Sequence, residues 1–191
     1  MRTEIGRPRN RGIDDAVLRA TVELLAECSY ADLSVEAIAM SAGTSKPAIY
    51  RRWRSKAHLV HEAVFPITAT TALPATGSVQ GDIREMLRRT LTVLSTPAAL
   101  AALPGLVGEM AADPTLHTAL LERFGDVLVR ALGDYLDTAA RRGEIRPGIS
   151  ADDLAEAVAG MTFLAVVTRG ALLDEQWIER TARLITEGIS P

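Results

Sequence analysis

A cluster of cations and hydroxyl-bearing residues lies in the first third of this 191-residue sequence and is suited to binding a polyanion. Its members follow one another closely: Ser45, Lys46, Tyr50, Arg51, Arg52, Arg54 and Lys56. Lysine and arginine bind phosphate oxygens, and hydroxyl groups form hydrogen bonds with phosphates and with the edges of bases. The segment is therefore a candidate surface for nucleic acid.

The distribution of charge along the chain favours the same interpretation. Residues 1–58 hold 10 lysines and arginines against 7 acidic residues, whereas residues 59–191 hold 11 against 17. A cationic region on a chain of net charge −3 directs a polyanion to one part of the molecule. From charge alone, a solvated face without a ligand explains the pattern equally well.

Other chemistry is poorly supported by the motifs. His58, His61 and Glu62 lie within one helical turn, but their order differs from that of the zinc-binding helices of metalloproteases. The sequence contains no nucleophile elbow and no glycine-rich phosphate loop. Cys28 is expected to be a small buried hydrophobe. We predict that the protein has no catalytic residue, no metal and no cofactor, and that it is not an enzyme.

The elements that position the cluster are predicted to be helices throughout. Apolar residues recur at helical spacing, aromatic residues make up only 4% of the chain, and no segment has the alternation of a strand. We predict an all-α fold of about nine helices, with a three-helix helix-turn-helix module followed by a larger helical domain. The expected divisions are a basic arm (1–11), the DNA-binding module (12–56), and a ligand-binding and dimerisation domain (57–191). Pro97 and Pro104 are expected to interrupt the sixth helical segment.

Two short helices joined by residues 42–44 carry the cluster. Ser34 is suited to cap the first helix, and Thr44 or Ser45 the second, while Gly43 favours the turn between them. Pro47 falls in the first turn of the second helix, where proline is tolerated. In a helix-turn-helix the second helix enters the major groove of DNA. An ordinary pair of packed helices remains the alternative on this pattern alone.

The same residues resemble a known family. The stretches 33–39, 42–50 and 51–56 strongly resemble the DNA-binding module of the tetracycline-repressor (TetR) family, and residues 6–9 look like its basic leader. The specific match covers about residues 6–65, and the rest of the chain is similar in its helical plan. Ser29 stands where the family usually has glycine, so we expect strain in the turn before Tyr30.

The resemblance implies roles for individual residues. Tyr50 and Lys56 would bind the DNA backbone, and the start of the second helix would read base edges. Arg51 and Arg52 suit either phosphate or guanine, and the arm with Arg7, Arg9 and Arg11 suits either the minor groove or solvent. Trp53 is expected to pack structurally against the neighbouring helices. The predicted DNA contacts are Ser34, Thr44, Ser45, Lys46, Pro47, Ala48, Tyr50, Arg51, Arg52 and Lys56.

A module of this size needs a second copy about 34 Å away to bind a palindrome. The resemblance implies that the last two helices pair with those of another chain in a four-helix bundle, although these residues also suit the core of a single chain. The predicted interface consists of Leu154, Val158, Met161, Ala165, Leu172, Trp177, Ile178, Ala182 and Ile185.

The resemblance also implies an effector pocket in the larger domain. Methionine and aromatic residues at helical spacing are common in plain cores, so the same side chains suit either purpose. No cluster of charges occurs among them, which favours a small, largely apolar effector. The predicted lining is Met86, Thr90, Met110, His117, Phe124, Met161, Thr162 and Phe163.

We therefore predict a homodimeric transcriptional regulator, a repressor that binds a palindromic operator in double-stranded DNA and leaves it when an effector binds. The alternative is a helical small-molecule-binding or enzymatic bundle without DNA binding. A single cysteine, the lack of an apolar leader and the lack of a long apolar run favour a cytoplasmic protein without a membrane span.

Overall fold

The computed structural model describes residues 11–66, 73–170 and 173–191, without the side chains of residues 11, 117 and 120–127. These ranges fold as helices and contain no strand, which confirms the all-α prediction. The helices are α1 (Arg11–Leu25), α2 (Val35–Ser41), α3 (Lys46–Tyr50), α4 (Lys56–Val64), α6 (Val79–Leu94), α7 (Pro97–Ala112), α8 (Pro114–Arg141), α9 (Ala151–Arg169) and α10 (Glu175–Ile189).

Local signals define the two short helices near the N-terminus. The Ser34 hydroxyl accepts a hydrogen bond from the backbone N–H of Ala37 at 3.1 Å, and the Ser45 hydroxyl caps α3 in the same way. Gly43 lies between them with a φ of +63°, a conformation that glycine adopts without steric cost. The turn therefore follows from the residue types that the sequence supplies.

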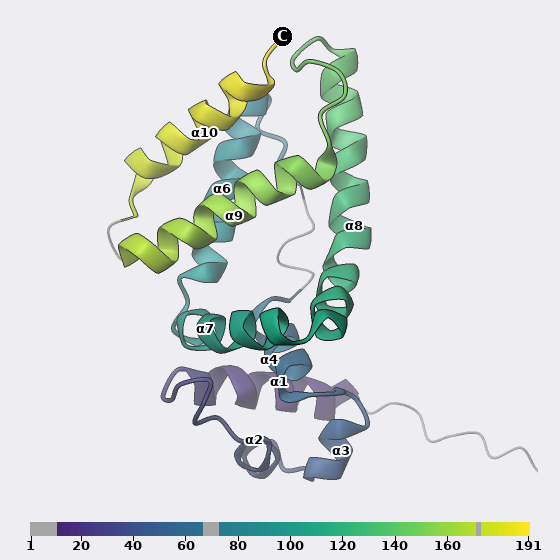
Figure 1. The fold of residues 1–191 in the computed structure, drawn as a ribbon, viewed down its shortest axis with the longest axis vertical. Coiled ribbons are helices and arrows are strands. Elements are labelled where there is room, and N and C mark those ends of the chain that lie inside the picture. The colour runs from purple at the N-terminus through teal and green to yellow at the C-terminus, as the bar shows by residue number, and fades with distance from the viewer. Residues whose placement is uncertain (1–10, 67–72, 171–172) are drawn as a thin grey trace, which may run out of the picture.

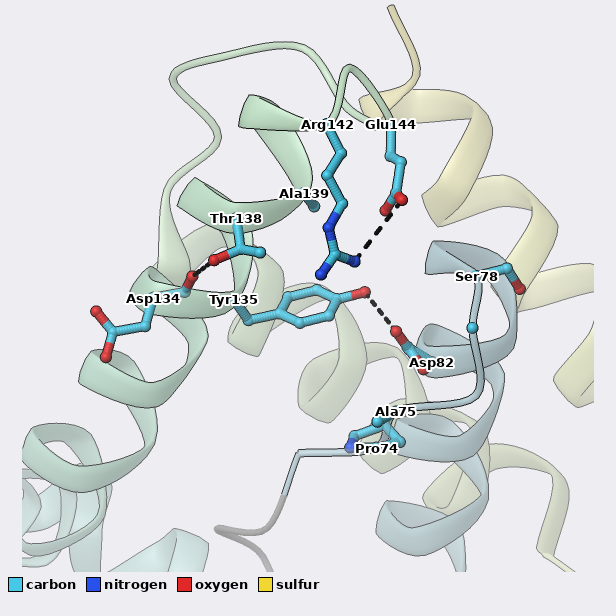
Figure 2. A pocket seen from close by; sticks show the side chains of 11 residues that line it. Pro74, Ala75, Ser78, Asp82, Asp134, Tyr135, Thr138, Ala139, Arg142 and Glu144 are labelled. Carbon is cyan, nitrogen blue, oxygen red and sulfur yellow. Dashed lines mark hydrogen bonds and ion pairs between the residues drawn. The ribbon is translucent and has the colours of Figure 1, made fainter.

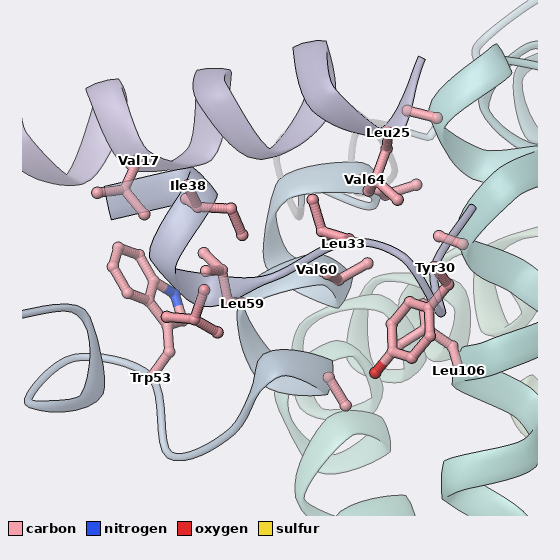
Figure 3. Packing of buried hydrophobic residues seen from close by; sticks show 14 of the residues in the cluster. Val17, Leu25, Tyr30, Leu33, Ile38, Trp53, Leu59, Val60, Val64 and Leu106 are labelled. Carbon is pink, nitrogen blue, oxygen red and sulfur yellow. The ribbon is translucent and has the colours of Figure 1, made fainter. Parts of the chain in front are cut away.

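The N-terminal helices α1 to α4 share one hydrophobic core with α7. Val17, Ile38 and Leu59 are completely buried in it, and Trp53 packs beside them (Figure 3). Helix α7 contributes Ala99 and other residues of one face to the same cluster. In Figure 1, α7 lies across the top of the N-terminal helices. The packing of the DNA-binding module therefore extends past residue 56 and includes a helix from far along the chain.

Helices α6, α8, α9 and α10 enclose a second core. Ile83 and Leu87 of α6 are completely buried there, against Leu136 of α8 and Trp177 of α10. Ion pairs reinforce the contact between α6 and α10, among them Arg84 with Glu179 at 2.6 Å. Because α6 contacts both α9 and α10, it forms the centre of this domain (Figure 1).

The expected break at Pro104 is wrong. Pro97 begins α7, as proline does in a first helical turn, but Pro104 lies inside a helix that continues to Ala112. A proline in this position removes one backbone hydrogen bond, to the carbonyl of Leu100. Leu100 and Pro104 are both exposed, so water can satisfy that carbonyl.

The backbone settles the expectation at Ser29 and bears on a possible membrane span. No described residue other than glycine has a positive φ, so the expected strain at Ser29 is absent, and its hydroxyl instead bonds to the Asp32 carboxylate at 2.6 Å. No single described helix is long and apolar enough to span a membrane. The pair α6 and α7 passes that test by length and composition, with a bend of 85° between them.

The turn at Gly43 gives a test of the fold. Gly43→Ala should lower the free energy of unfolding by about 1–2 kcal/mol, because alanine is disfavoured at positive φ. Gly133→Ala is the matched control, since Gly133 lies within α8 with open space around it. That substitution should stabilise the helix by about 1 kcal/mol. Thermal denaturation followed by circular dichroism measures both, and equal effects would contradict the assigned turn.

Candidate functional site

Helix α3 has one buried face and one exposed face. Ile49 is 1% exposed and Trp53, just after the helix, is 5% exposed, so both anchor α3 in the first core. The Trp53 indole donates to Glu62 of α4 at 2.9 Å, in keeping with the structural role expected for it. The exposed residues of this segment form what we call the α3 face: Ser45, Lys46, Pro47, Tyr50 and Arg51.

Lys46 on the α3 face forms an ion pair with Glu36 of α2. The hydrogen bond between them raises the pKa of Lys46 and lowers that of Glu36. The same ammonium group lies 5.9 Å from the centre of the Tyr50 ring. Both partners of the ion pair are well exposed, so a phosphate group can compete with Glu36 for the lysine. Sequence reasoning did not find Glu36, because its distance to Lys46 depends on the turn between the helices.

Arg52 is engaged within the protein. Its guanidinium group forms an ion pair with Asp14 of α1 and donates to the carbonyl oxygen of Ala48 at 3.1 Å. These contacts tie the end of α3 to α1. Arg51 is the exposed arginine of the pair, and the choice between phosphate and guanine stays a prediction for both.

Lys56 is also engaged within the protein. Its ammonium group donates to the carbonyl oxygens of Tyr30 at 2.8 Å and Leu33 at 3.3 Å, and lies 4.1 Å from the centre of the Tyr30 ring. A lysine has three N–H donors, and two of them are used here. In this structure Lys56 joins α4 to the loop between α1 and α2, and its predicted contact with the DNA backbone stays a prediction.

The remaining predicted contacts lie around the α3 face. Ser34 is exposed at the start of α2, while Thr44 and Ala48 are half-buried beside α3. Arg7 and Arg9, and the side chain of Arg11, lie outside the described residues. The structure therefore brings the polar residues from Thr44 to Arg51 together on one surface.

A cavity of about 400 Å³ lies in the larger domain, between the start of α6 and the end of α8 (Figure 2). At its wall the Tyr135 hydroxyl donates to a carboxylate oxygen of Asp82 at 3.1 Å, and Asp82 also accepts from the hydroxyl of Thr76. Burial and the Asp82 charge raise the pKa of Tyr135, so the tyrosine remains a donor. The lining residues are Pro74, Ala75, Gly77, Ser78, Asp82, Asp134, Tyr135, Thr138, Ala139, Arg142 and Glu144.

None of the residues predicted to line an effector pocket borders this cavity. Met86 is buried in the second core, and Met161 packs against the same core. Met110 packs against the first core. Thr162 is fully buried, and its hydroxyl donates to the carbonyl of Val158 at 2.6 Å. Thr90 and Phe163 are half-buried. The side chains of His117 and Phe124 lie outside the described residues.

Most of the residues predicted for a dimer interface are buried within the single chain, and the interface itself stays a prediction. A side chain that is buried within one chain has little surface left to bury against another. Met161 is half-buried, and Leu172 lies outside the described residues. The others are all buried in the second core of a single chain: Leu154, Val158, Ala165, Trp177, Ile178, Ala182 and Ile185.

Metal ligation finds no support in the described ranges, which contain no group of three or more histidine, cysteine, aspartate or glutamate side chains arranged for an ion. His61 instead lies edge-on to the ring of Phe65, with 5.5 Å between the ring centres. Cys28 is half-buried and forms no disulfide.

Comparison with known proteins identifies both parts of the chain. Residues 17–63 match the family model for bacterial regulatory proteins of the tetR family, and residues 73–185 match that for the tetracyclin repressor-like C-terminal domain. The DNA-binding transcriptional repressor TetR of Mycobacteroides abscessus is 31% identical over 86% of this chain and 87% of that protein. The HTH-type transcriptional regulator YdeS of Bacillus subtilis is 27% identical over 93% of this chain and 90% of that protein.

A solved structure agrees with these relatives. The crystal structure of the TetR family transcription regulator SCO0332 aligns with a TM-score of 0.71 and 26% identity, covering 94% of this chain and 99% of that one. The fold and the α3 face thus define a helix-turn-helix transcriptional regulator. The chain belongs to the tetracycline-repressor family.

The ion pair on the α3 face gives a test of its function. Glu36→Gln should strengthen binding to any DNA duplex by about two- to fivefold at low salt, because it frees Lys46 and removes a negative charge from the surface. Fluorescence anisotropy titrations over a range of salt concentrations measure the change. Asp137→Asn, on the exposed side of α8, makes the same change of charge and should have no effect. Equal affinities for the two variants would rule out a role for the α3 face.

Proposed function

We propose that this protein represses transcription by binding a palindromic operator as a homodimer through the α3 face, and that a small-molecule effector releases it. Each α3 enters the major groove, where Ser45, Lys46 and Pro47 approach the base edges. Tyr50 and Arg51 lie on the same exposed surface and are placed to contact phosphates. As a DNA-binding regulator it acts in the cytoplasm.

The observation that carries this proposal is the exposure of polar and cationic side chains on a helix that is firmly anchored from behind. Ile49 and Trp53 fix the orientation of α3, and Arg52 ties it to α1. A rigid support of this kind holds the reading side chains in place before DNA binds, which lowers the entropic cost of recognition. Repression is supported by the relative from Mycobacteroides abscessus, which is named as a repressor.

Selection from a pool of random duplexes tests the function directly. The wild-type chain should enrich one palindromic sequence, and log K for that sequence should fall linearly with log salt concentration. Arg51→Ala should weaken binding to the selected duplex and reduce the slope by about one unit for each half-site. The absence of any enriched palindrome would contradict the proposal.

Dimerisation is proposed to use apolar side chains that the single chain leaves exposed on α9 and α10. Leu164 and Val167, separated by one turn of α9, are 61% and 62% exposed, and Leu184 of α10 is 60% exposed. The opposite faces of both helices are buried in the second core. Helix α9 therefore has apolar side chains on two sides and α10 adds one exposed leucine, as expected for helices that pack in a chain and against a second copy.

Substitution of an exposed leucine tests this interface. Leu164→Glu should shift the protein toward monomers, because two carboxylates would be buried near each other in a symmetric interface. Operator affinity should fall with it. Leu100→Glu is the control, since Leu100 of α7 is 48% exposed and lies outside the proposed interface. Analytical ultracentrifugation gives the mass of each variant, and a dimer as stable as the wild type for Leu164→Glu would exclude this surface.

The effector is proposed to bind in the larger domain. The cavity beside Tyr135 combines an apolar wall at Pro74 and Ala139 with polar and charged side chains, among them Tyr135, Arg142 and Glu144, and a pocket with such convergent polar groups suits a small molecule. As a second proposal, the effector binds among the residues that the sequence predicted to line a pocket. Tyr135→Trp, which fills the cavity, should abolish release if the effector binds there, while leaving operator binding intact.

A further inference from the structure

Tyr30, in the loop between α1 and α2, lies along one face of α7 over two helical turns. Its backbone N–H donates to the carbonyl of Ala101 at 3.3 Å, and its hydroxyl donates to Glu109 at 2.7 Å. Its ring packs directly on Gly105, midway between those two positions. The three residues of α7 are spaced four apart and therefore form one stripe on the helix. We call these contacts of Tyr30 with Ala101, Gly105 and Glu109 the Tyr30 anchor.

The geometry at Gly105 shows how close the approach is. A Cβ atom added to Gly105 would lie 2.1 Å from a ring carbon of Tyr30, a distance that two carbon atoms do not tolerate. Glycine is disfavoured inside helices by about 1 kcal/mol relative to alanine. At this position it provides the space that the ring occupies.

The anchor also holds the start of α4. Lys56 donates to the carbonyl of Tyr30 and lies over its ring. Tyr30, which itself belongs to the α1–α2 loop, therefore contacts both α4 and α7. Tyr30 is only 6% exposed, and its burial together with the Glu109 carboxylate raises its pKa. The hydroxyl therefore stays protonated and continues to donate to Glu109 at physiological pH.

We infer that the Tyr30 anchor fixes the orientation of the DNA-binding module on α7 and thereby sets the distance between half-sites that a dimer accepts. The inference rests on the proposed function, and it makes Tyr30 a positioning residue that does not itself contact DNA. A palindrome of the right spacing binds best because the two modules are already held at that distance. When the anchor loosens, each module takes a range of orientations, and discrimination between spacings falls.

Removing one oxygen atom tests the inference. The operator selected by the wild-type chain is prepared with its centre shortened or lengthened by one base pair, and affinities are measured by anisotropy. The ratio of the affinity for the selected operator to the affinity for an operator of altered spacing should fall about three- to tenfold in Tyr30→Phe. This is the range that one net hydrogen bond provides. Thr186→Val is the control, since it loses the hydrogen bond from its hydroxyl to the Ala182 carbonyl within α10, outside the Tyr30 anchor, and should keep the wild-type ratio.

Variants of α7 provide an independent measurement. Glu109→Gln retains an oxygen that accepts from the Tyr30 hydroxyl and should keep the ratio, whereas Glu109→Ala should lower it as Tyr30→Phe does. Gly105→Ala displaces the ring and should also lower the ratio. Gly108→Ala, on the same helix with open space around it, should leave it unchanged. Hydrogen exchange of residues 28–34 should be faster in the variants that lower the ratio.

The outcomes separate the anchor from the proposed function. If Tyr30→Phe and Glu109→Ala are folded by circular dichroism and discriminate between spacings as the wild type does, the anchor does not set the spacing. If the wild-type chain selects no palindrome at all, the proposed function is overturned, and the role in spacing is overturned with it.

Discussion

The burial of α7 in the same hydrophobic core as the N-terminal helices is the constraint on which the rest of the structure depends. A small three-helix module has little core of its own, and here Ala99, Ala102 and Leu106 from α7 complete it. The position of the DNA-binding module is therefore coupled to that of α7. Any change in the larger domain that shifts α7 must also shift the α3 face, which gives a physical route from ligand to DNA.

Within this arrangement the cations around α3 divide into two groups. Arg52 and Lys56 are half-buried and hold α3 and α4 in place, whereas Lys46, Arg51 and Arg54 are exposed, with Lys46 paired to the exposed Glu36. The charges of Arg52 and Lys56 are used within the protein and add less to its positive surface, but their contacts hold the exposed cations on a rigid support. The affinity for DNA phosphates then depends on a few exposed charges. The rest of the chain is negative overall, which limits the binding of DNA elsewhere on its surface.

Most of the fold could be predicted from the sequence because its signals are local. Ser34, Ser45 and Gly43 define their turns through residues at most a few positions away, and the cationic cluster is continuous along the chain. The partners of Arg52 and Lys56 could not be predicted, since they depend on how helices pack. Tyr30 and Glu109 are 79 residues apart and meet only once α7 lies on the N-terminal helices. The surface that pairs two copies could not be chosen from the sequence for a similar reason: apolar spacing shows that a helix has a buried face but not which partner covers it.

The most direct test uses the two lysines of the chain, Lys46 and Lys56, which both lie in the module. Acetylation of each is followed by mass spectrometry, with and without a saturating amount of the selected duplex. The account predicts that the exposed Lys46 reacts faster than Lys56 in the free protein and is protected by DNA, and that Lys56 reacts slowly in both states because carbonyl groups hold its ammonium group. Equal reactivity of Lys46 with and without bound duplex would contradict the assignment of the α3 face as the DNA-binding surface.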